Sequence, residues 1–428
     1  MIEPNIREQI IALIKREVVP AVGCTEPMAV ALCVSRATEA LECRPEKITA
    51  LLSANILKNA MGVGIPGTGM IGLPIAIALG AIIGKSEYQL EVIKDVCPEA
   101  IEQGKQYIDE GRIDIQLKQG ECDKLYVEIL CEGDGHTASA IISGSHTHFV
   151  KVTRDDKVLL DELAGRSNDV DDGDIELKLR LVYDFAMQAP LDEISFILET
   201  LDYNLKAARE SLKGNYGHCL GKTMDRPLSH GIFGNTIFSR ILSKTALATD
   251  ARMGGALIPV MSNSGSGNQG ICATNPVAVY AIENENTEEE TIRALTLSHL
   301  TAIYIKQSLG KLSALCGCVV ASIGSSCGIT YLMGGSFERI CYAVKNMIAN
   351  LTGMICDGAK PSCALKITSG VSTALLSAVL AMEGRHVTSA EGIIDDDVDR
   401  SIHTLTVIGA DAMGATDQMV LNIMTTKT

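Results

Sequence analysis

The sequence predicts an α+β fold, with a large helical C-terminal core and a small antiparallel β-sheet subdomain. Apolar residues recur with the period of a helix before about residue 95 and after about residue 174. Between residues 113 and 152 they alternate with the period of a strand. The 428 residues are 46% hydrophobic and include 39 Gly but no Trp, so we expect a large core packed through small residues.

The N-terminal part, residues 1–95, is expected to be helical and glycine-rich. Apolar residues at helical spacing predict helices over 8–19 and 28–41. Cys24 lies in the short segment that joins these helices. A glycine-rich stretch that contains Pro66 and Pro74 follows.

Residues 96–165 are expected to form the antiparallel sheet. Alternating polar and apolar residues predict strands over 113–117, 125–130, 137–142 and 147–152. Glycine-containing turns separate these segments, as in a meander of antiparallel strands.

Residues 166–428 are expected to form the helical domain, with helices over 176–187, 191–211, 235–249, 288–309 and 337–350. Two stretches without a charged residue, 59–84 and 312–337, are long enough to cross a bilayer. Paired, glycine-interrupted apolar segments also occur in transporters. Because there are no further spans and no interfacial Trp, buried helices of a soluble core explain both stretches better.

Charge and composition exclude several function classes. The formal net charge of −15 and the lack of any Lys/Arg run argue against nucleic acid as a partner. We expect a small-molecule substrate and no membrane association, and the sequence leaves a homodimer open. The 14 Cys, with no cleavable leader at the N-terminus, predict a cytoplasmic location and reduced thiols.

Three cysteines near the C-terminus have the spacing of a metal cradle. Cys356 and Cys363 frame a short, proline-containing segment, and Cys316 lies forty residues earlier, in a Cys-Gly-Cys turn. Three thiolates can hold an iron–sulfur cluster and leave one iron without a protein ligand, as a Lewis acid. Structural zinc sites close all four positions with two nearby pairs, and no second pair lies near Cys363.

Cys24 is a candidate base or nucleophile. It precedes Thr25, a plausible N-cap, and Pro27, which suits the first turn of a helix. The positive end of the helix dipole is expected to lower the thiol pKa and favour the thiolate. An incidental cysteine in a capping turn is the alternative.

A small polar loop over 262–272 is a candidate anion site. Its backbone amides could form a nest for a carboxylate, and it lacks the glycine and lysine pattern of nucleotide-binding loops. A plain surface loop is the alternative. The predicted substrate-binding residues come from this loop and from the segment before the glycine-rich stretch: Lys58, Asn59, Asn263, Gly267, Asn268 and Gln269.

Four segments in order carry a family resemblance: 21–27 (Ala-Val-Gly-Cys-Thr-Glu-Pro), 58–69, 267–270 (Gly-Asn-Gln-Gly) and 356–363 (Cys-Asp-Gly-Ala-Lys-Pro-Ser-Cys). Together they resemble the L-cysteine desulfidase family over nearly the whole chain. The C-terminal half is more distantly similar to the alpha part of iron–sulfur L-serine dehydratases. The resemblance implies a 4Fe-4S enzyme that converts L-cysteine to pyruvate, ammonia and hydrogen sulfide.

The family pattern also implies roles for individual residues. Cys316, Cys356 and Cys363 become the cluster ligands, with Cys318 as the alternative to Cys316, and Cys24 becomes the base that removes the α-proton. The polar loop then holds the substrate carboxylate, and the open iron binds the leaving thiolate. Such a cluster is expected to be lost in aerobic preparations.

Three alternatives remain open from the sequence. L-Serine dehydration could use the same mechanism, because the sequence does not separate the two substrates. A pyridoxal lyase would need a Schiff-base lysine such as Lys58 or Lys360. A non-catalytic iron–sulfur sensor could bind cysteine through the same residues without turning it over.

Overall fold

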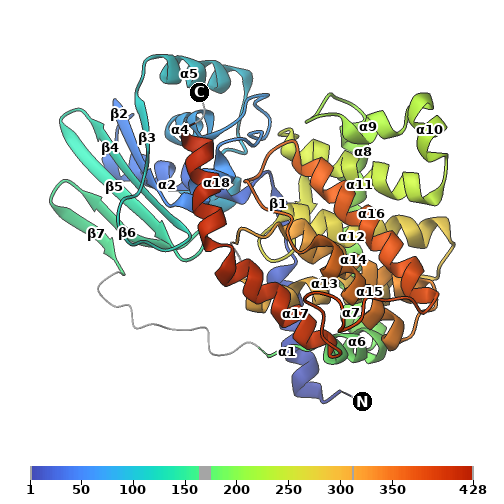
Figure 1. The fold of residues 1–428 in the computed structure, drawn as a ribbon. Coiled ribbons are helices and arrows are strands. Elements are labelled where there is room, and N and C mark those ends of the chain that lie inside the picture. The colour runs from blue at the N-terminus through green and yellow to red at the C-terminus, as the bar shows by residue number, and fades with distance from the viewer. Residues whose placement is uncertain (1, 163–174, 311–312, 427–428) are drawn as a thin grey trace.

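The computed structural model describes residues 2–162, 175–310 and 313–426. It confirms the α+β class (Figure 1). A six-stranded sheet and its covering helices form one lobe, at the left in Figure 1, and a bundle of helices forms the other. The predicted boundary between residues 165 and 166 lies outside the described residues, so the proposed division into domains stays a prediction.

The N-terminal helices are shared between the two lobes. α1 (Pro4–Glu17) buries Ile10, Leu13 and Ile14 in the core of the helical lobe. The next helices pack in the core of the sheet lobe: α2 (Thr25–Leu41), α3 (Ala54–Ala60), α4 (Leu73–Ile82) and α5 (Pro98–Asp109). α2 is buried on almost every side because it lies between the sheet and α4.

The sheet is mixed rather than purely antiparallel. Its strand order is β3-β2-β4-β5-β6-β7, and β2 pairs in parallel with β3. The strands are β2 (Lys47–Leu52), β3 (Ile113–Leu117), β4 (Tyr126–Gly133), β5 (His136–Ser143), β6 (Phe149–Arg154) and β7 (Lys157–Asp161). A parallel pair needs a long crossover, which α3, α4 and α5 supply, so a strand from the N-terminal part joins the predicted meander.

The helical lobe is built around α14 (Gly317–Leu332). This helix carries no charge and is buried on all sides, because α12 (Gly267–Glu283), α13 (Glu288–Leu309), α15 (Phe337–Leu351) and α16 (Cys363–Met382) pack around it. The remaining helices of this part are α6 (Leu179–Gln188), α7 (Leu191–Ile194), α8 (Glu199–Ser211), α9 (Leu220–Met224), α10 (Pro227–Phe233) and α11 (Ile237–Met253).

Among the described residues, one helix, α16, is long and apolar enough to cross a membrane, and half of its apolar window is buried inside the fold. The two uncharged stretches seen in the sequence contain α4 and α14, which both lie inside the protein. Their apolar character is therefore explained by core packing.

The C-terminus crosses from the helical lobe to the sheet lobe. α17 (Val398–Val407) packs on α13 and α15. A π-helical turn, Ile408–Ala412, then leads to α18 (Gly414–Thr426), which contacts α3. Leu421 of α18 is part of the core of the sheet lobe, and Figure 1 shows this red helix lying between the lobes.

A small second sheet ties together two segments that are far apart in the sequence. β1 (Pro20–Val22) pairs antiparallel with β8 (Pro259–Met261). The backbone amide of Ser262 continues this pairing with a hydrogen bond to the oxygen of Val19, 2.8 Å long. As a result, Cys24 and the polar segment 262–269 both emerge at the same place between the lobes.

Candidate active site

One cavity collects most of the residues that the sequence singled out. Its volume is about 170 Å³, and we call it the cysteine cavity because its walls include Cys24, Cys316, Cys318, Cys356 and Cys363. Of the predicted substrate-binding residues, Asn59, Asn268 and Gln269 also line it. A larger cavity, about 910 Å³, has no cysteine on its walls and shares Ser264 and Lys306 with the cysteine cavity.

Four of these thiols come from two helix starts and one loop. Cys316 is the N-cap of α14, Cys318 lies in its first turn, and Cys363 begins α16. Cys356 lies in the loop before α16. The Cys316 thiol is in hydrogen-bond contact with both Cys318 and Cys356, so the two distant segments of the predicted cradle meet in the fold.

The loop 356–363 is held in place by its backbone. Leu315 and Ile355 form a β-bridge, and the amides of Cys316 and Cys356 donate to the oxygens of Met354 and Ala314. Gly358 has a φ of +90°, and a Cβ there would collide with the backbone oxygen of Lys58. Only glycine fits this turn without strain.

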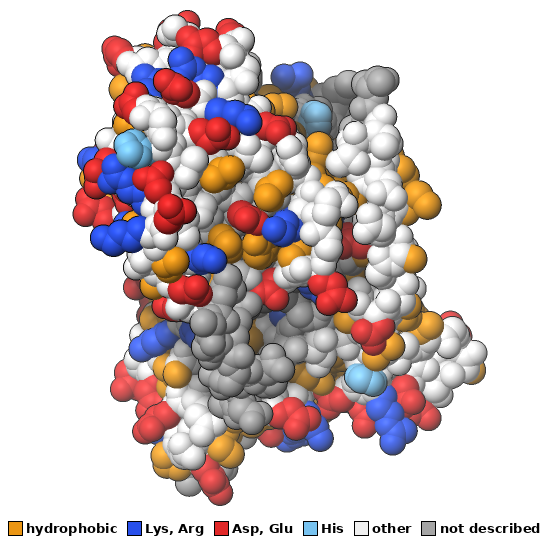
Figure 2. Space-filling view, turned by 90° about the vertical axis from the view of Figure 1, so that its left-hand side faces the viewer, with side chains coloured by type: hydrophobic (Ala, Val, Ile, Leu, Met, Phe, Trp, Pro, Cys, Tyr) orange, Lys and Arg blue, Asp and Glu red, His pale blue; other side chains and the backbone are white. Residues whose placement is uncertain are grey.

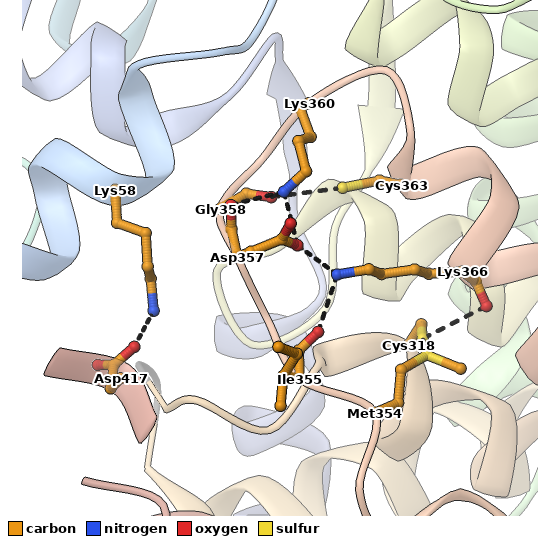
Figure 3. A network of polar contacts seen from close by, with 10 residues as sticks. All are labelled: Lys58, Cys318, Met354, Ile355, Asp357, Gly358, Lys360, Cys363, Lys366 and Asp417. Atoms are coloured by element: carbon orange, nitrogen blue, oxygen red, sulfur yellow. Dashed lines mark hydrogen bonds and ion pairs between the residues drawn. The ribbon is translucent and has the colours of Figure 1, made fainter. Parts of the chain in front are cut away.

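Charged side chains brace the same loop (Figure 3). Asp357 forms ion pairs with Lys366 and Lys360, the latter 2.6 Å long. Lys366 Nζ also donates to the oxygen of Ile355 at 2.8 Å. Although burial acts to raise the pKa of Asp357, the two lysines lower it to about 2. This carboxylate therefore stays ionised and paired with the lysines at neutral pH.

The donors fit an iron–sulfur cluster by their chemistry. Soft thiolates favour such clusters, copper(I) or zinc. The hydrogen bond to Cys316 raises the pKa of Cys356, and the charge of Lys58 opposes this shift. Burial raises the pKa of Cys363, against the charges of Lys360 and Lys366. These lysines favour the thiolates that a metal would need. Among the described residues, no three His, Cys, Asp or Glu side chains are arranged as for a metal ion.

The contacts of Cys316 and Cys318 differ. Cys316 contacts Cys356, whereas Cys318 donates to Met354 Sδ at 3.2 Å and to the oxygen of Lys366 at 3.6 Å. Of the two thiols, Cys316 has the contact with Cys356, and its role as the third ligand stays a prediction.

Cys24 is a neutral thiol, not the activated thiolate that the sequence suggested. It is the N-cap of α2, but its Sγ donates a hydrogen bond to Glu26 Oε2 at 2.8 Å instead of capping the helix. Burial raises the pKa of Cys24 well above its usual value, and the charge of Glu26 adds to this shift. Arg252 acts in the opposite direction without reversing it. The predicted lowering of this pKa was wrong because burial outweighs the helix dipole.

Glu26 is the centre of this end of the cavity. Besides Cys24, it accepts hydrogen bonds from Thr25 Oγ1 and from Asn59 Nδ2, both at 3.1 Å. Burial acts to raise its pKa, but His146, the Cys24 thiol and Arg252 lower it overall. A buried, ionised carboxylate therefore lies beside the candidate base and accepts the hydrogen bond of its S–H group.

The predicted polar loop is partly helical. Residues 263–266 form a tight turn closed by an Asn263–Ser266 bridge, and α12 begins at Gly267 with Ser266 as its N-cap. Asn268 and Gln269 therefore lie in the first turn of a helix, where free amides attract anions. Gly267 does not line the cysteine cavity, but it lies against Arg252, which does.

Asn263 does not line the cysteine cavity. It is fully buried, and its Nδ2 lies 3.1 Å from both Nδ1 and the backbone oxygen of His299. Thr274 Oγ1 lies 2.9 Å from His299 Nε2. The contacts of Asn263 are those of a core residue that supports the turn before α12.

Asn263→Ala should therefore lower stability by about 1–3 kcal/mol, because it leaves buried polar groups without partners. Ligand affinity of the folded protein should change little. Urea unfolding at pH 7 measures the first effect and calorimetric titration with an amino acid the second. A large loss of affinity at unchanged stability would contradict the structural role.

His299 makes stability depend on pH. Burial lowers its pKa to about 3, from an ordinary value of 6.5. Between these values the unfolded chain holds a proton that the folded chain lacks, so stability falls as the pH drops from about 6.5 towards 3. In His299→Gln, the free energy of unfolding should fall less between pH 7 and pH 5 than in the wild type. An unchanged pH dependence would contradict this assignment.

Lys58 is not part of the wall of the cysteine cavity. It is 2% exposed, and its ammonium forms an ion pair with Asp417 of α18 (Figure 3). Lys360 Nζ donates to the backbone oxygen of Asp357 at 2.6 Å and pairs with its carboxylate. Neither lysine lines the cavity, so neither contacts a substrate bound there as the fold stands.

Sequence reasoning missed five charged or titratable residues of the cavity wall: Glu26, His146, Arg252, Lys306 and Lys366. Glu26 could have been found as the acid of the Cys-Thr-Glu-Pro segment. His146 lies between β5 and β6 and brings the sheet lobe to the cavity, within a Gly-Ser-His-Thr-His segment. Arg252 had no local signal, because it lies in the last turn of an ordinary helix.

Comparison with known proteins identifies the family and several relatives of this chain. Residues 87–422 match the family described as "Serine dehydratase alpha chain". A UPF0597 protein of Bacteroides fragilis is 67% identical over 98% of both chains. One of Bacteroides thetaiotaomicron is 65% identical over 100% of this chain and 99% of its own, and one of Photobacterium profundum is 44% identical over 99% of both.

Proposed function

This chain belongs to the serine dehydratase alpha chain family, and we propose that it is an iron–sulfur-dependent L-cysteine desulfidase. The family itself suggests a lyase of the serine dehydratase type. The proposed enzyme would eliminate the β-substituent of L-cysteine and give pyruvate, ammonia and hydrogen sulfide. The observation that carries the proposal is that Cys24 lines the same cavity as Cys316, Cys356 and Cys363. Elimination needs a base and a Lewis acid on adjacent carbons of one small substrate.

The three cysteines would hold a 4Fe-4S cluster, with the positive charges of Lys58, Lys360 and Lys366 nearby. When bound, a cluster with one open iron supplies a Lewis acid that stabilises the departing sulfur. An open iron is sensitive to oxygen, so we expect the cluster to be lost from aerobically prepared protein.

Cys24 acts as the base only after it has lost its own proton. Glu26 Oε2 accepts the S–H hydrogen bond at 2.8 Å and so orients the sulfur, while the S–H proton itself is released to solvent. The Cys24 thiolate then takes the α-proton as the Cβ–S bond breaks and the sulfur leaves with the bonding pair. The resulting aminoacrylate is hydrolysed in water to pyruvate and ammonia.

The first turn of α12 orients the substrate. Asn268 and Gln269 line the cavity there, and the helix start attracts the substrate carboxylate. The family description names a serine dehydratase, so L-serine dehydration is the second candidate. A cysteine sensor would bind at the same place without turnover.

We further propose a cytoplasmic location. All 14 cysteines are free thiols in the structure, as expected in a reducing compartment. Figure 2 shows basic and acidic side chains interspersed on one face of the sheet lobe, without a continuous basic patch there. The absence of nucleic-acid and membrane partners and a homodimeric state stay predictions.

Metal analysis and an absorption spectrum test the cofactor. After anaerobic reconstitution with iron and sulfide, the protein should bind iron and acid-labile sulfide and show broad absorption in the visible blue. Purified in air, it should show little of this absorption. Zinc with full activity, or the spectrum of a pyridoxal Schiff base, would contradict the iron–sulfur assignment.

A further inference from the structure

Arg252 is a buried cation on the wall of the cysteine cavity. It lies in the last turn of α11 and is 3% exposed. Its Nη1 donates to Asn268 Oδ1 at 3.0 Å and contacts Met253 Sδ at 3.9 Å. Its Nε is buried without a hydrogen-bond partner. Within the described ranges, no carboxylate forms an ion pair with this guanidinium.

The Arg252 guanidinium therefore lacks a hydrogen-bond partner for Nε and, among the described residues, a carboxylate partner for its charge. Removing a charge from water is costly unless the charge is paired and its donors are satisfied. The charge of Arg252 lowers the pKa of Glu26. The hydrogen bonds that Glu26 accepts, however, come from Cys24, Thr25 and Asn59. The remaining guanidinium donors therefore favour an anion that enters the cavity.

The start of α12 is shaped around this guanidinium. A Cβ on Gly267 would collide with Arg252 Nε, so glycine is what allows the close approach. Asn268, one residue further, holds Nη1. The N-terminus of this 17-residue helix and the arginine thus present positive charge at one place on the cavity wall.

Gln269 lies between this place and the cysteines. Its Oε1 is buried without a hydrogen-bond partner, and its side chain packs against Gly317, between Cys316 and Cys318. The unpaired Gln269 Oε1 can accept a hydrogen bond from the ammonium of an amino acid, and the Arg252 guanidinium can bind its carboxylate.

We propose that Arg252, set by Gly267 and Asn268 at the start of α12, binds the free α-carboxylate of the substrate. The inference rests on the proposed function and narrows its substrate class to free amino acids. Amides, esters and cysteine residues inside peptides lack the carboxylate and are excluded by the same contact. Charged, planar recognition of this kind is what arginine does better than lysine.

Calorimetric titration with L-alanine and L-alaninamide tests the contact without turnover. L-Alanine has no leaving group, and the amide has the same shape without the negative charge. Wild-type protein, before and after anaerobic reconstitution, should bind L-alanine and not L-alaninamide. Arg252→Gln should weaken L-alanine binding about 10- to 100-fold, as loss of a charge-assisted contact does. Arg252→Lys should recover part of the loss.

Arg240→Gln is the matched control, because Arg240 lies on the same helix but pairs with Glu283 at 2.8 Å outside the cysteine cavity. Its affinity for L-alanine should stay at the wild-type value. If Arg252→Gln fails to fold, Gly267→Ala displaces the guanidinium while keeping its charge, and should also weaken binding.

Equal binding of L-alanine and L-alaninamide by the wild type, or an unchanged affinity in a folded Arg252→Gln, would overturn the inference. Failure of the proposed function has a different signature. In that case L-alanine would bind through Arg252, but reconstituted protein would form no pyruvate from L-cysteine or L-serine.

Discussion

Cys363→Ser should lose its iron on anaerobic reconstitution, and with it all sulfide release. The serine hydroxyl is a poor ligand where the wild type offers a soft thiolate. Cys363 begins α16 and lies on the wall of the cysteine cavity together with Cys356. Iron and acid-labile sulfide per chain, measured after gel filtration, give the result directly. Full iron content in this variant would remove Cys363 from the ligand set.

Cys219→Ser is the matched control, because Cys219 also lies at a helix start but not on the cavity wall. It should keep its iron and its activity.

The same assay separates the two cysteines at the start of α14. Cys316→Ser should lose iron, whereas Cys318→Ser should keep most of it, since Cys318 is engaged with Met354 and the backbone of Lys366. The reverse result would exchange their roles.

Cys24→Ala should keep its iron and lose turnover by a factor of about 10² to 10⁴, the usual contribution of a general base. The variant removes the only sulfur that donates to Glu26 among the described residues, without touching the cluster cysteines. Added L-cysteine should still change the absorption of the cluster, because its thiolate can reach the open iron while its α-proton stays in place.

Cys33→Ala controls for the loss of a buried thiol from the same helix. Cys33 donates to the backbone oxygen of Ala140 at 3.2 Å, in the core of the sheet lobe, so its loss should cost stability and leave turnover per folded enzyme unchanged. Near wild-type sulfide release from Cys24→Ala would show that another group is the base. Glu26 would then be the next residue to replace.

Some of the regular elements followed from local periodicity. The predicted strand 113–117 and helix 288–309 coincide with β3 and α13. The parallel pairing of β2 with β3 was missed because it depends on a contact between segments more than sixty residues apart. The start of α12 was read as a loop because Ser, Asn and Gly dominate it, and these residues suit caps as well as turns.

The site could be predicted as a set of residue types, but not as an electrostatic arrangement. Spacing alone indicated Cys356 and Cys363, and the fold places Cys316 beside Cys356. The state of Cys24 could not be inferred, because its pKa depends mainly on its burial, which arises only in the folded chain. Arg252 was missed because nothing in the sequence of α11 indicates that its last turn faces Asn268 of α12.

The most direct test of the central claim is the product assay on anaerobically reconstituted protein. With L-cysteine, the proposed lyase should release pyruvate and hydrogen sulfide in equal amounts, at a rate that follows the iron content. If pyruvate formed from L-serine but not from L-cysteine, the elimination mechanism would stand and the substrate would be L-serine. Iron-loaded protein whose spectrum responds to L-cysteine but that forms no pyruvate from either amino acid would contradict the account.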